Sequence, residues 1–267
     1  MDDRAIGVFD SGFGGLTVAR AMIDLLPGED LVYFGDTGRY PYGPRPLDDV
    51  RDFAREITSM LIERHDVKMV VVACNTAAAA ALDLLRFEFD IPIVGVIDPG
   101  VRAMLVATRN RRVGVIGTVG TIRSGAYQRA VLGMRADVTL TCSACPGFVE
   151  FVERGETDSE QVHVLAERLL APAKAAGVDT LLLGCTHYPF LARTIGDVMG
   201  PEVVLVSSAE ETAFEVLAIL EETGLGTRTA GKGRHVFVSS GDVGWFRTLG
   251  SRLLGPELED AEAWSWD

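Results

Sequence analysis

The sequence predicts an α/β protein of two pseudo-symmetric α/β domains with mainly parallel sheets and an active site at the domain interface. The first observation is a pair of apolar runs that each contain a cysteine near the end, residues 69–76 and 180–187. Apolar runs of this length, followed by a helix pattern, are typical of parallel strands covered on both faces. The second observation is another pair of similar segments, residues 6–12 and 113–119. Because the members of each pair lie nearly the same distance apart, 111 and 107 positions, we infer two similar halves.

Cys74 and Cys185 stand at the carboxyl ends of two predicted strands, one in each half. Ligands bind at that edge in open α/β sheets, and the N-terminus of the helix that follows lowers the pKa of a thiol. One cysteine from each half therefore suggests a functional pair. The alternative is that each cysteine packs as a small buried hydrophobe, as free cysteines usually do.

The composition indicates a globular chain of 267 residues, 48% of them hydrophobic, with a formal net charge of −13. That charge disfavours a nucleic-acid surface, which needs Lys and Arg to neutralise phosphates, but an anionic small substrate is compatible with it. No segment is apolar enough to span a membrane, and the start lacks a secretion signal, so a cytoplasmic protein without membrane contact is expected. The four cysteines are expected to be reduced thiols.

The first half alternates predicted strands and helices. In order, these are a strand over residues 5–9, a helix from the turn that follows to Leu26, a strand over 31–34, a helix over 47–63, the strand that leads to Cys74, a helix over 77–85 and a strand over 93–97. Residues 39–46 contain three prolines and a glycine, which exclude a helix. This loop is either a wall or lid of a pocket or an ordinary connection.

A glycine-rich turn, residues 10–15, follows the first strand. It lacks the third glycine of a dinucleotide-binding fingerprint, because Thr17 stands there. Asp10 and Ser11 in this turn are either a helix-capping pair or site residues. The corresponding turn of the second half carries Thr118 and Thr121, which either cap a helix or donate hydrogen bonds to a carboxylate.

The second half is predicted to hold a helix over 159–176 and strands over 113–116, 138–141, 180–184 and 203–207. Asp98-Pro99-Gly100 is a natural crossing between domains. The first domain is expected to recruit a helix over 209–222, a strand over 235–239 and a helix over 243–254. The predicted domains are residues 1–97 with 208–267, and residues 98–207. The tail from Pro256, with five acidic residues and two tryptophans, is expected to be weakly ordered.

His187 lies two residues after the second cysteine, where an imidazole supplies or takes up charge beside a thiolate. Cys142 and Cys145 form a single C-x-x-C, which alone is half a zinc site or a redox pair. No second such motif accompanies it and the four histidines are scattered, so no metal is predicted. Glu150 and Glu153 share a helical face and by themselves suggest solvated carboxylates.

Taken together, these segments resemble the glutamate racemases of the aspartate/glutamate racemase family. The resemblance spans nearly the whole chain and rests on Val8-Phe9-Asp10-Ser11-Gly12-x-Gly14-Gly15, Gly35-Asp36, Tyr40-Pro41-Tyr42-Gly43, Ala73-Cys74-Asn75-Thr76-Ala77, Ala144-Cys145-Pro146-x-Phe148-Val149 with Glu153, and Gly184-Cys185-Thr186-His187-Tyr188-Pro189. Cys142 is not part of the pattern, so its C-x-x-C is interpreted as incidental. The resemblance implies an enzyme without a cofactor that interconverts L- and D-glutamate and supplies D-glutamate for peptidoglycan.

Inversion of an α-carbon requires a base on one face and an acid on the other, and two facing cysteines meet that need. The resemblance assigns Cys74 to the proton of D-glutamate and Cys185 to that of L-glutamate. It makes Asp10 and His187 acid/base partners of the thiols, with Asp36 and Glu153 in lesser roles. The residues implied to hold the substrate are Asp10, Ser11, Tyr42, Gly43, Asn75, Thr76, Thr118, Thr121, Thr186 and His187.

Three alternatives stay open. A related racemase, for example one of aspartate, would use the same two-thiol chemistry, and the length of the pocket is not legible in the sequence. Inhibition of DNA gyrase is a second activity of some family members, and nothing in this acidic sequence demonstrates it. A non-enzymatic two-lobed ligand binder is the third alternative, although it needs no matched thiols. The resemblance also implies a homodimer.

Overall fold

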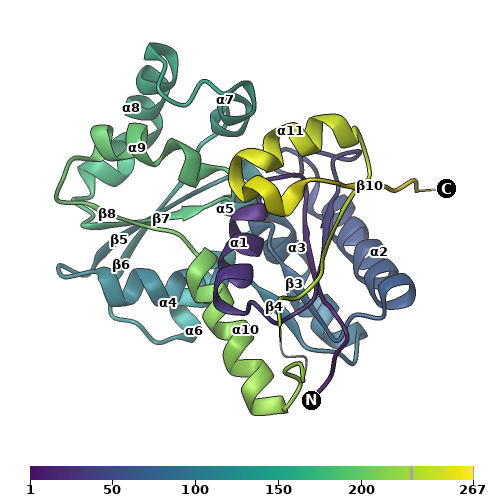
Figure 1. Cartoon of the computed structure of the whole chain (residues 1–267). Coiled ribbons are helices and arrows are strands. Elements are labelled where there is room, and N and C mark those ends of the chain that lie inside the picture. The colour runs from purple at the N-terminus through teal and green to yellow at the C-terminus, as the bar shows by residue number, and fades with distance from the viewer. Residues whose placement is uncertain (229–230, 267) are drawn as a thin grey trace. The chain divides into compact units, whose positions relative to one another are not determined.

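The computed structural model describes residues 1–228 and 231–266. The chain divides into two compact units, Met1–Val96 with Ala209–Asp267 (unit 1) and Ile97–Ser208 (unit 2). Each unit has its own parallel sheet with helices packed on it, so the predicted class of two mainly parallel α/β domains is confirmed (Figure 1). In the described part of the chain, no helix is both long and apolar enough to cross a membrane.

The sheet of unit 1 has six strands in the order β10-β9-β2-β1-β3-β4, and every neighbouring pair is parallel. Its strands are β1 (Ile6–Asp10), β2 (Leu31–Gly35), β3 (Met69–Val72), β4 (Ile93–Gly95), β9 (His235–Ser239) and β10 (Glu262–Ala263). All residues of the three central strands are buried. Burial along every position, not every second one, shows that helices cover both faces of this part of the sheet.

The helices of unit 1 form two packed groups. The first group comprises α1 (Leu16–Leu25), α10 (Ala209–Thr223), and α11 (Val243–Leu254) with the short 3₁₀ helix η2 (Gly255–Leu258). The second group comprises α2 (Leu47–His65) and α3 (Asn75–Glu88). The chain between β2 and α2 forms no helix, as the prolines predicted, and this loop lies at the carboxyl ends of the strands.

The sheet of unit 2 has four parallel strands in the order β6-β5-β7-β8. They are β5 (Arg112–Gly117), β6 (Thr139–Ala144), β7 (Thr180–Gly184) and β8 (Val204–Val206). Around them lie α4 (Ile97–Ala107), α5 (Val119–Arg123), α6 (Ala126–Gly133), α7 (Phe148–Arg154), α8 (Glu160–Ala175), η1 (Tyr188–Leu191) and α9 (Ala192–Met199). Helix α4 packs against α6 and β7, and α8 packs against α9 and β6.

The two sheets share one topology. In unit 1 the first four strands of the chain lie in the order second, first, third, fourth, and the four strands of unit 2 repeat that order. The similar segments in the sequence are thus equivalent strands, β1 with β5 and β3 with β7. In this order the chain reverses its direction of winding between the first and third strands, and α/β sheets bind their ligands at the carboxyl ends of these strands.

The structure differs from the prediction where the first half ends. The strand predicted over 93–97 ends at Gly95, and Ile97 begins α4, which the sequence analysis lacks. Asp98 and Pro99 fit the first turn of a helix, because an acidic side chain is favoured by the helix dipole and proline there loses no hydrogen bond.

The expectation of a weakly ordered tail is wrong for residues 256–266. Pro256 lies in η2, and β10 pairs in parallel with β9 at the edge of the sheet. The rings of Trp264 and Trp266 both pack edge-on against Phe34 of β2. These aromatic contacts with a distant strand give the acidic tail its fixed place.

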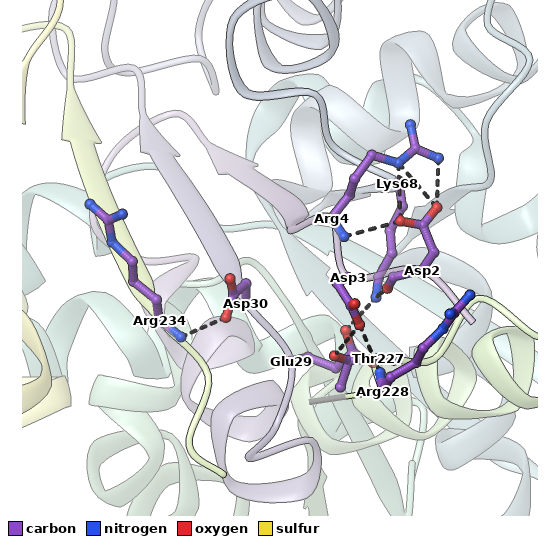
Figure 2. A network of polar contacts seen from close by, with 9 residues as sticks. All are labelled: Asp2, Asp3, Arg4, Glu29, Asp30, Lys68, Thr227, Arg228 and Arg234. Atoms are coloured by element: carbon purple, nitrogen blue, oxygen red, sulfur yellow. Dashed lines mark hydrogen bonds and ion pairs between the residues drawn. The ribbon is translucent and has the colours of Figure 1, made fainter. Parts of the chain in front are cut away.

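The amino ends of the strands in unit 1 carry a buried ion pair (Figure 2). Lys68 precedes β3 and Glu29 precedes β2, and the Lys68 Nζ lies 2.5 Å from the Glu29 Oε2. Lys68 also donates to the carbonyl oxygen of Asp2 at 2.7 Å, and Glu29 accepts a hydrogen bond from the backbone N–H of Thr227 at 2.8 Å. The pair therefore joins four segments at the edge of the sheet opposite to Cys74.

Candidate active site

In unit 1, the predicted site residues gather at the carboxyl ends of two neighbouring strands. Asp10 ends β1 and Ser11 follows it, and Cys74 follows β3, which pairs with β1. Asp10, Ser11 and Cys74 are buried. The Cys74 Sγ lies 3.8 Å from the Ser11 Oγ, within the distance of a weak sulfur hydrogen bond.

Cys74 also occupies the capping position of α3. Its backbone is extended, and its carbonyl oxygen accepts the first helical bond, from the N–H of Ala78 at 2.8 Å. Asn75 and Thr76 form the first turn of the same helix and are both buried. The thiol therefore stands at the start of a helix, as the sequence predicted.

The pKa of the Cys74 thiol is nevertheless raised to about 12, first by burial and second by the charge of Asp10. The backbone N–H groups of Ala77 and Ser11 act in the opposite direction. The expectation that the helix lowers the thiol pKa is therefore wrong in its net result, since desolvation and the neighbouring carboxylate outweigh the helix. In the free protein Cys74 is a thiol at neutral pH.

The turn after β1 holds Asp10 in place. The Asp10 Oδ1 accepts a hydrogen bond from the N–H of Gly12 at 2.9 Å, and the Tyr33 hydroxyl donates to the Gly12 carbonyl at 2.9 Å. A Cβ atom on Gly15 would lie 2.5 Å from the Asp10 Cβ, so only glycine fits at that position. The carboxylate is thus fixed by its own turn before any ligand binds.

Asp36 lies just beyond β2, is fully buried and has both carboxylate oxygens engaged. Its Oδ2 accepts from the Tyr42 hydroxyl and from the Arg39 Nε at 2.7 Å. Its Oδ1 accepts from the Ser240 Oγ at 2.6 Å and from the Trp266 Nε1 at 3.2 Å. These four donors indicate that Asp36 positions the loop that carries Tyr42 and Gly43.

In unit 2, Cys185 is the equivalent of Cys74. It follows β7, is buried, and lies next to β5, the strand that leads to Thr118. A Cβ atom on Gly184 would lie 2.7 Å from the carbonyl oxygen of Ile116 and 2.7 Å from the Tyr127 hydroxyl. Glycine before Cys185 therefore allows the backbone of β7 to pass close to β5 and α6.

His187 and Glu153 meet within unit 2, although 34 positions separate them in the chain. Burial lowers the pKa of His187 to about 4, so the imidazole is neutral at neutral pH. Its Nε2 lies 3.8 Å from the Oε1 of Glu153, whose side chain is 19% exposed. Glu153 is thus mostly covered and turned toward the histidine, unlike the solvated carboxylate that its helical face suggested.

Three threonines predicted to bind the substrate lie in unit 2, at the start of α5 and after β7. Thr118 is the N-cap of α5, and its side chain accepts from the Thr121 N–H at 3.2 Å. The two hydroxyl oxygens lie 2.9 Å apart. Helix capping, one of the two readings of this turn, is thus present, and Thr186 lies buried directly after Cys185.

The C-x-x-C cysteines lie in and just after β6. Cys142 is half-buried, Cys145 is buried, and both are free thiols whose pKa values are raised by burial. Within residues 1–228 and 231–266, no three His, Cys, Asp or Glu side chains converge in a way that would hold a metal ion.

Sequence reasoning missed the donors that surround Asp36. Arg39 lies in the predicted loop, and it was treated only as part of a proline-rich segment. Ser240 and Trp266 lie 204 and 230 positions from Asp36, so no local pattern connects them. The one available signal was the presence of two tryptophans in an otherwise acidic tail.

Comparisons with known proteins extend these observations. Residues 6–214 match the family model described as Asp/Glu/Hydantoin racemase. The glutamate racemase of Geobacter metallireducens is 51% identical over 261 residues, which cover 97% of this chain and 96% of the relative. The crystal structure of a glutamate racemase isoform from Bacillus anthracis has a TM-score of 0.93 at 40% identity, covering 100% of this chain and 98% of that one. That of the Francisella tularensis glutamate racemase in complex with D-glutamate has a TM-score of 0.92 at 32% identity, covering 100% and 99%.

Proposed function

The chain belongs to the Asp/Glu/Hydantoin racemase family, and from that premise we propose that it interconverts L- and D-glutamate by a two-cysteine proton transfer. The predicted resemblance to glutamate racemases is confirmed by the relatives at about half identity over nearly the whole chain. The observation that carries the mechanism is the equivalent placement of Cys74 and Cys185. Each is a buried thiol at the carboxyl end of the third strand of its own unit, at the edge where ligands bind.

The proposed reaction uses one thiol as base and the other as acid. For D-glutamate, the thiolate of Cys74 takes the α-proton and becomes a thiol, and the thiol of Cys185 gives its proton to the opposite face and becomes a thiolate. L-Glutamate reacts with the roles exchanged. The inversion step itself conserves the number of protons on the two sulfurs.

Asp10 is proposed as the proton acceptor of Cys74. In the free protein the thiol carries its proton, because burial and the Asp10 charge raise its pKa. Transfer of that proton to the Asp10 carboxylate neutralises the charge that disfavours the thiolate. The ammonium group of the substrate, placed next to the sulfur, would stabilise the thiolate further.

His187 is proposed to play the same part for Cys185. A neutral imidazole accepts a proton, and burial keeps His187 neutral. Once protonated, it becomes a cation 3.8 Å from the Glu153 carboxylate, which then forms an ion pair with it. Glu153 would therefore act through His187, which supports the lesser role that the resemblance implied.

Each unit carries some of the proposed substrate ligands. Tyr42 and Gly43 lie in the loop positioned by Asp36, and the remaining proposed ligands are Asp10, Ser11, Asn75, Thr76, Thr118, Thr121, Thr186 and His187. Hydroxyl, amide and backbone N–H donors of this kind bind carboxylates without a cation. D-Glutamate for peptidoglycan, the cytoplasm as location and a homodimer as assembly belong to the same proposal, and they rest on the family resemblance.

The test is proton exchange at the α-carbon. Each glutamate enantiomer is incubated in deuterated water with the wild type, Cys74→Ser, Cys185→Ser and, as matched control, Cys142→Ser. Wild type and Cys142→Ser should racemise glutamate with deuterium uptake, and both other variants should lose about 10²- to 10⁴-fold in rate. Residual exchange from one enantiomer alone identifies the cysteine that serves it. If wild type leaves both glutamate enantiomers unchanged but racemises aspartate, the substrate assignment is wrong and the two-thiol chemistry stands.

A further inference from the structure

We infer that Trp266, in the tail after β10, is a positioning residue for the loop of residues 36–43. This inference rests on the proposed function in one respect, because that function assigns Tyr42 and Gly43 of this loop to substrate binding. All the groups concerned lie in unit 1. The contacts that support it start at the edge of the sheet and reach the candidate ligand Tyr42.

The tail is anchored at the sheet edge by the backbone. Glu262 and Ala263 of β10 pair with β9, and the N–H of Trp264 donates to the carbonyl of Ser239 at 2.8 Å. The Trp266 ring packs edge-on against Phe34 of β2, with the centroids 5.5 Å apart. These contacts direct the indole of Trp266 to the end of β2, where the loop begins.

From this position Trp266 contacts the loop in two ways. Its Nε1 donates to the Asp36 Oδ1 at 3.2 Å. Its ring lies over the Arg39 guanidinium, 4.1 Å from the carbon to the ring centroid, and the Phe53 ring lies 4.2 Å from the same carbon. Arg39 is thus stacked between the tail and α2, and its Nε donates to the other oxygen of Asp36.

Asp36 connects Trp266 and Arg39 to Tyr42, the candidate substrate ligand. The Tyr42 hydroxyl donates to the same oxygen of Asp36 that receives the Arg39 Nε, and the Tyr42 ring packs against Phe53 at 5.6 Å. Loss of the Trp266 indole removes one donor to a buried carboxylate and uncovers one face of Arg39. The loop then loses its contact with the tail, while Cys74 keeps its place after β3.

This separation predicts an effect on KM more than on kcat. Trp266→Leu should raise the KM for glutamate roughly tenfold, the change expected when a hydrogen bond to a charged group and a cation–π contact are lost. The kcat value should change less than about threefold, because proton transfer depends on the sulfurs. Trp266→Phe keeps a ring over Arg39 and loses only the N–H donor, so its KM should rise by a smaller factor.

Trp264→Phe is the matched control. Trp264 lies two residues earlier in the same tail and packs on the same Phe34, and its Nε1 has no hydrogen-bond partner among the described residues. The same Trp-to-Phe change therefore removes an N–H that makes no hydrogen bond to the described residues, and phenylalanine keeps an aromatic ring beside Trp266. Its KM should stay within about twofold of the wild type, which separates the hydrogen bond to Asp36 from general loss of an indole in the tail.

Backbone amide hydrogen exchange of residues 36–46 provides a readout that does not depend on activity. Exchange in this segment should be faster in Trp266→Leu and Trp266→Phe than in Trp264→Phe, with the exchange of β3 and α3 unchanged. Equal exchange and equal KM in Trp266→Phe and Trp264→Phe would overturn the inference. If the wild type does not act on glutamate, the proposed function fails, and the exchange comparison still decides the role of Trp266. If Trp266→Leu does not fold, Trp266→Phe and its control decide it.

Discussion

The Cys74 thiol lies buried beside the Asp10 carboxylate, and burial and this charge together raise its pKa to about 12. Asp10 ends β1 and Cys74 follows the neighbouring parallel strand β3, so the sheet fixes their distance. A buried thiol with this pKa does not react as a nucleophile at neutral pH, although it stands at a helix N-terminus. The rate at which Cys74 reacts with an alkylating reagent therefore depends on the charges that raise its pKa.

Asp10→Asn should lower the pKa of Cys74 while leaving it above the ordinary value, because burial is the larger cause and remains. At pH 9 the variant should react with iodoacetamide several-fold faster at Cys74 than the wild type, since only the thiolate attacks. Mass spectrometry of the labelled peptides measures the rate. Labelling of Cys142, whose raised pKa comes from burial alone, is the internal control and should be the same in both proteins. Racemisation by the variant should fall despite its more reactive thiol.

His187 should make the protein less stable in acid. The folded chain binds a proton at His187 only below about pH 4, whereas the unfolded chain binds it below about 6.5. The free energy of unfolding therefore falls as the pH drops from 6.5 to 4, by about 3 kcal/mol over the whole window. Above pH 6.5 His187 is neutral in both states and causes no change with pH. Urea unfolding at several pH values measures this slope. His187→Asn should flatten it. A slope that is the same in the variant and the wild type would contradict the assignment.

The ion pair between Lys68 and Glu29 should be important for stability and irrelevant to catalysis. Lys68→Met leaves a buried carboxylate without its cation, which costs about 3–5 kcal/mol of unfolding free energy. The double variant Lys68→Met with Glu29→Leu should recover part of that loss, because no charge then stays buried alone. Urea denaturation measures both. The kcat/KM values of the folded variants should match the wild type, since the pair lies at the amino edge of the sheet and the cysteine at the carboxyl edge.

Gly184→Ala should displace Cys185. The added Cβ would meet the carbonyl oxygen of Ile116 at 2.7 Å, and backbone atoms of a central strand cannot move aside cheaply. We expect a loss of about 1–3 kcal/mol in stability and a fall in kcat for both enantiomers. Gly133→Ala is the control, because Gly133 ends α6 with nothing within 4 Å of the added atom, and it should be neutral or slightly stabilising. Wild-type kinetics in Gly184→Ala would show that the close passage of β7 does not place the thiol.

The sequence was informative wherever one local pattern determined the structure. Continuous apolar runs predicted β1, β2, β3, β5 and β7, and the carboxyl ends of these strands located Asp10, Cys74 and Cys185. The repeated offset of the two cysteine segments corresponds to a strand order that occurs in both units. Helix α4 was missed because Asp98-Pro99-Gly100 is equally typical of a turn and of the first turn of a helix.

Properties that depend on distant partners were not predictable. The donors to Asp36 come from the loop, from the residue after β9 and from the tail, and only their packing brings them together. To predict that the pKa of Cys74 is raised, one must know how deeply the thiol is buried, and the sequence does not give this depth. In the same way, the contact of Glu153 with His187 depends on how α7 packs near η1.

Unit 1 is interrupted by unit 2 in the chain, and this has a consequence for synthesis on the ribosome. Strand β2 needs β9 as its outer neighbour, yet β9 is translated after the whole of Ile97–Ser208. Unit 2, which is one continuous segment, is therefore free to complete its sheet first. Until β9 is translated, β2 has an open edge that is prone to aggregation. The unit that begins to emerge first is thus the last to be finished, and Asp36 receives Ser240 and Trp266 only in that final step.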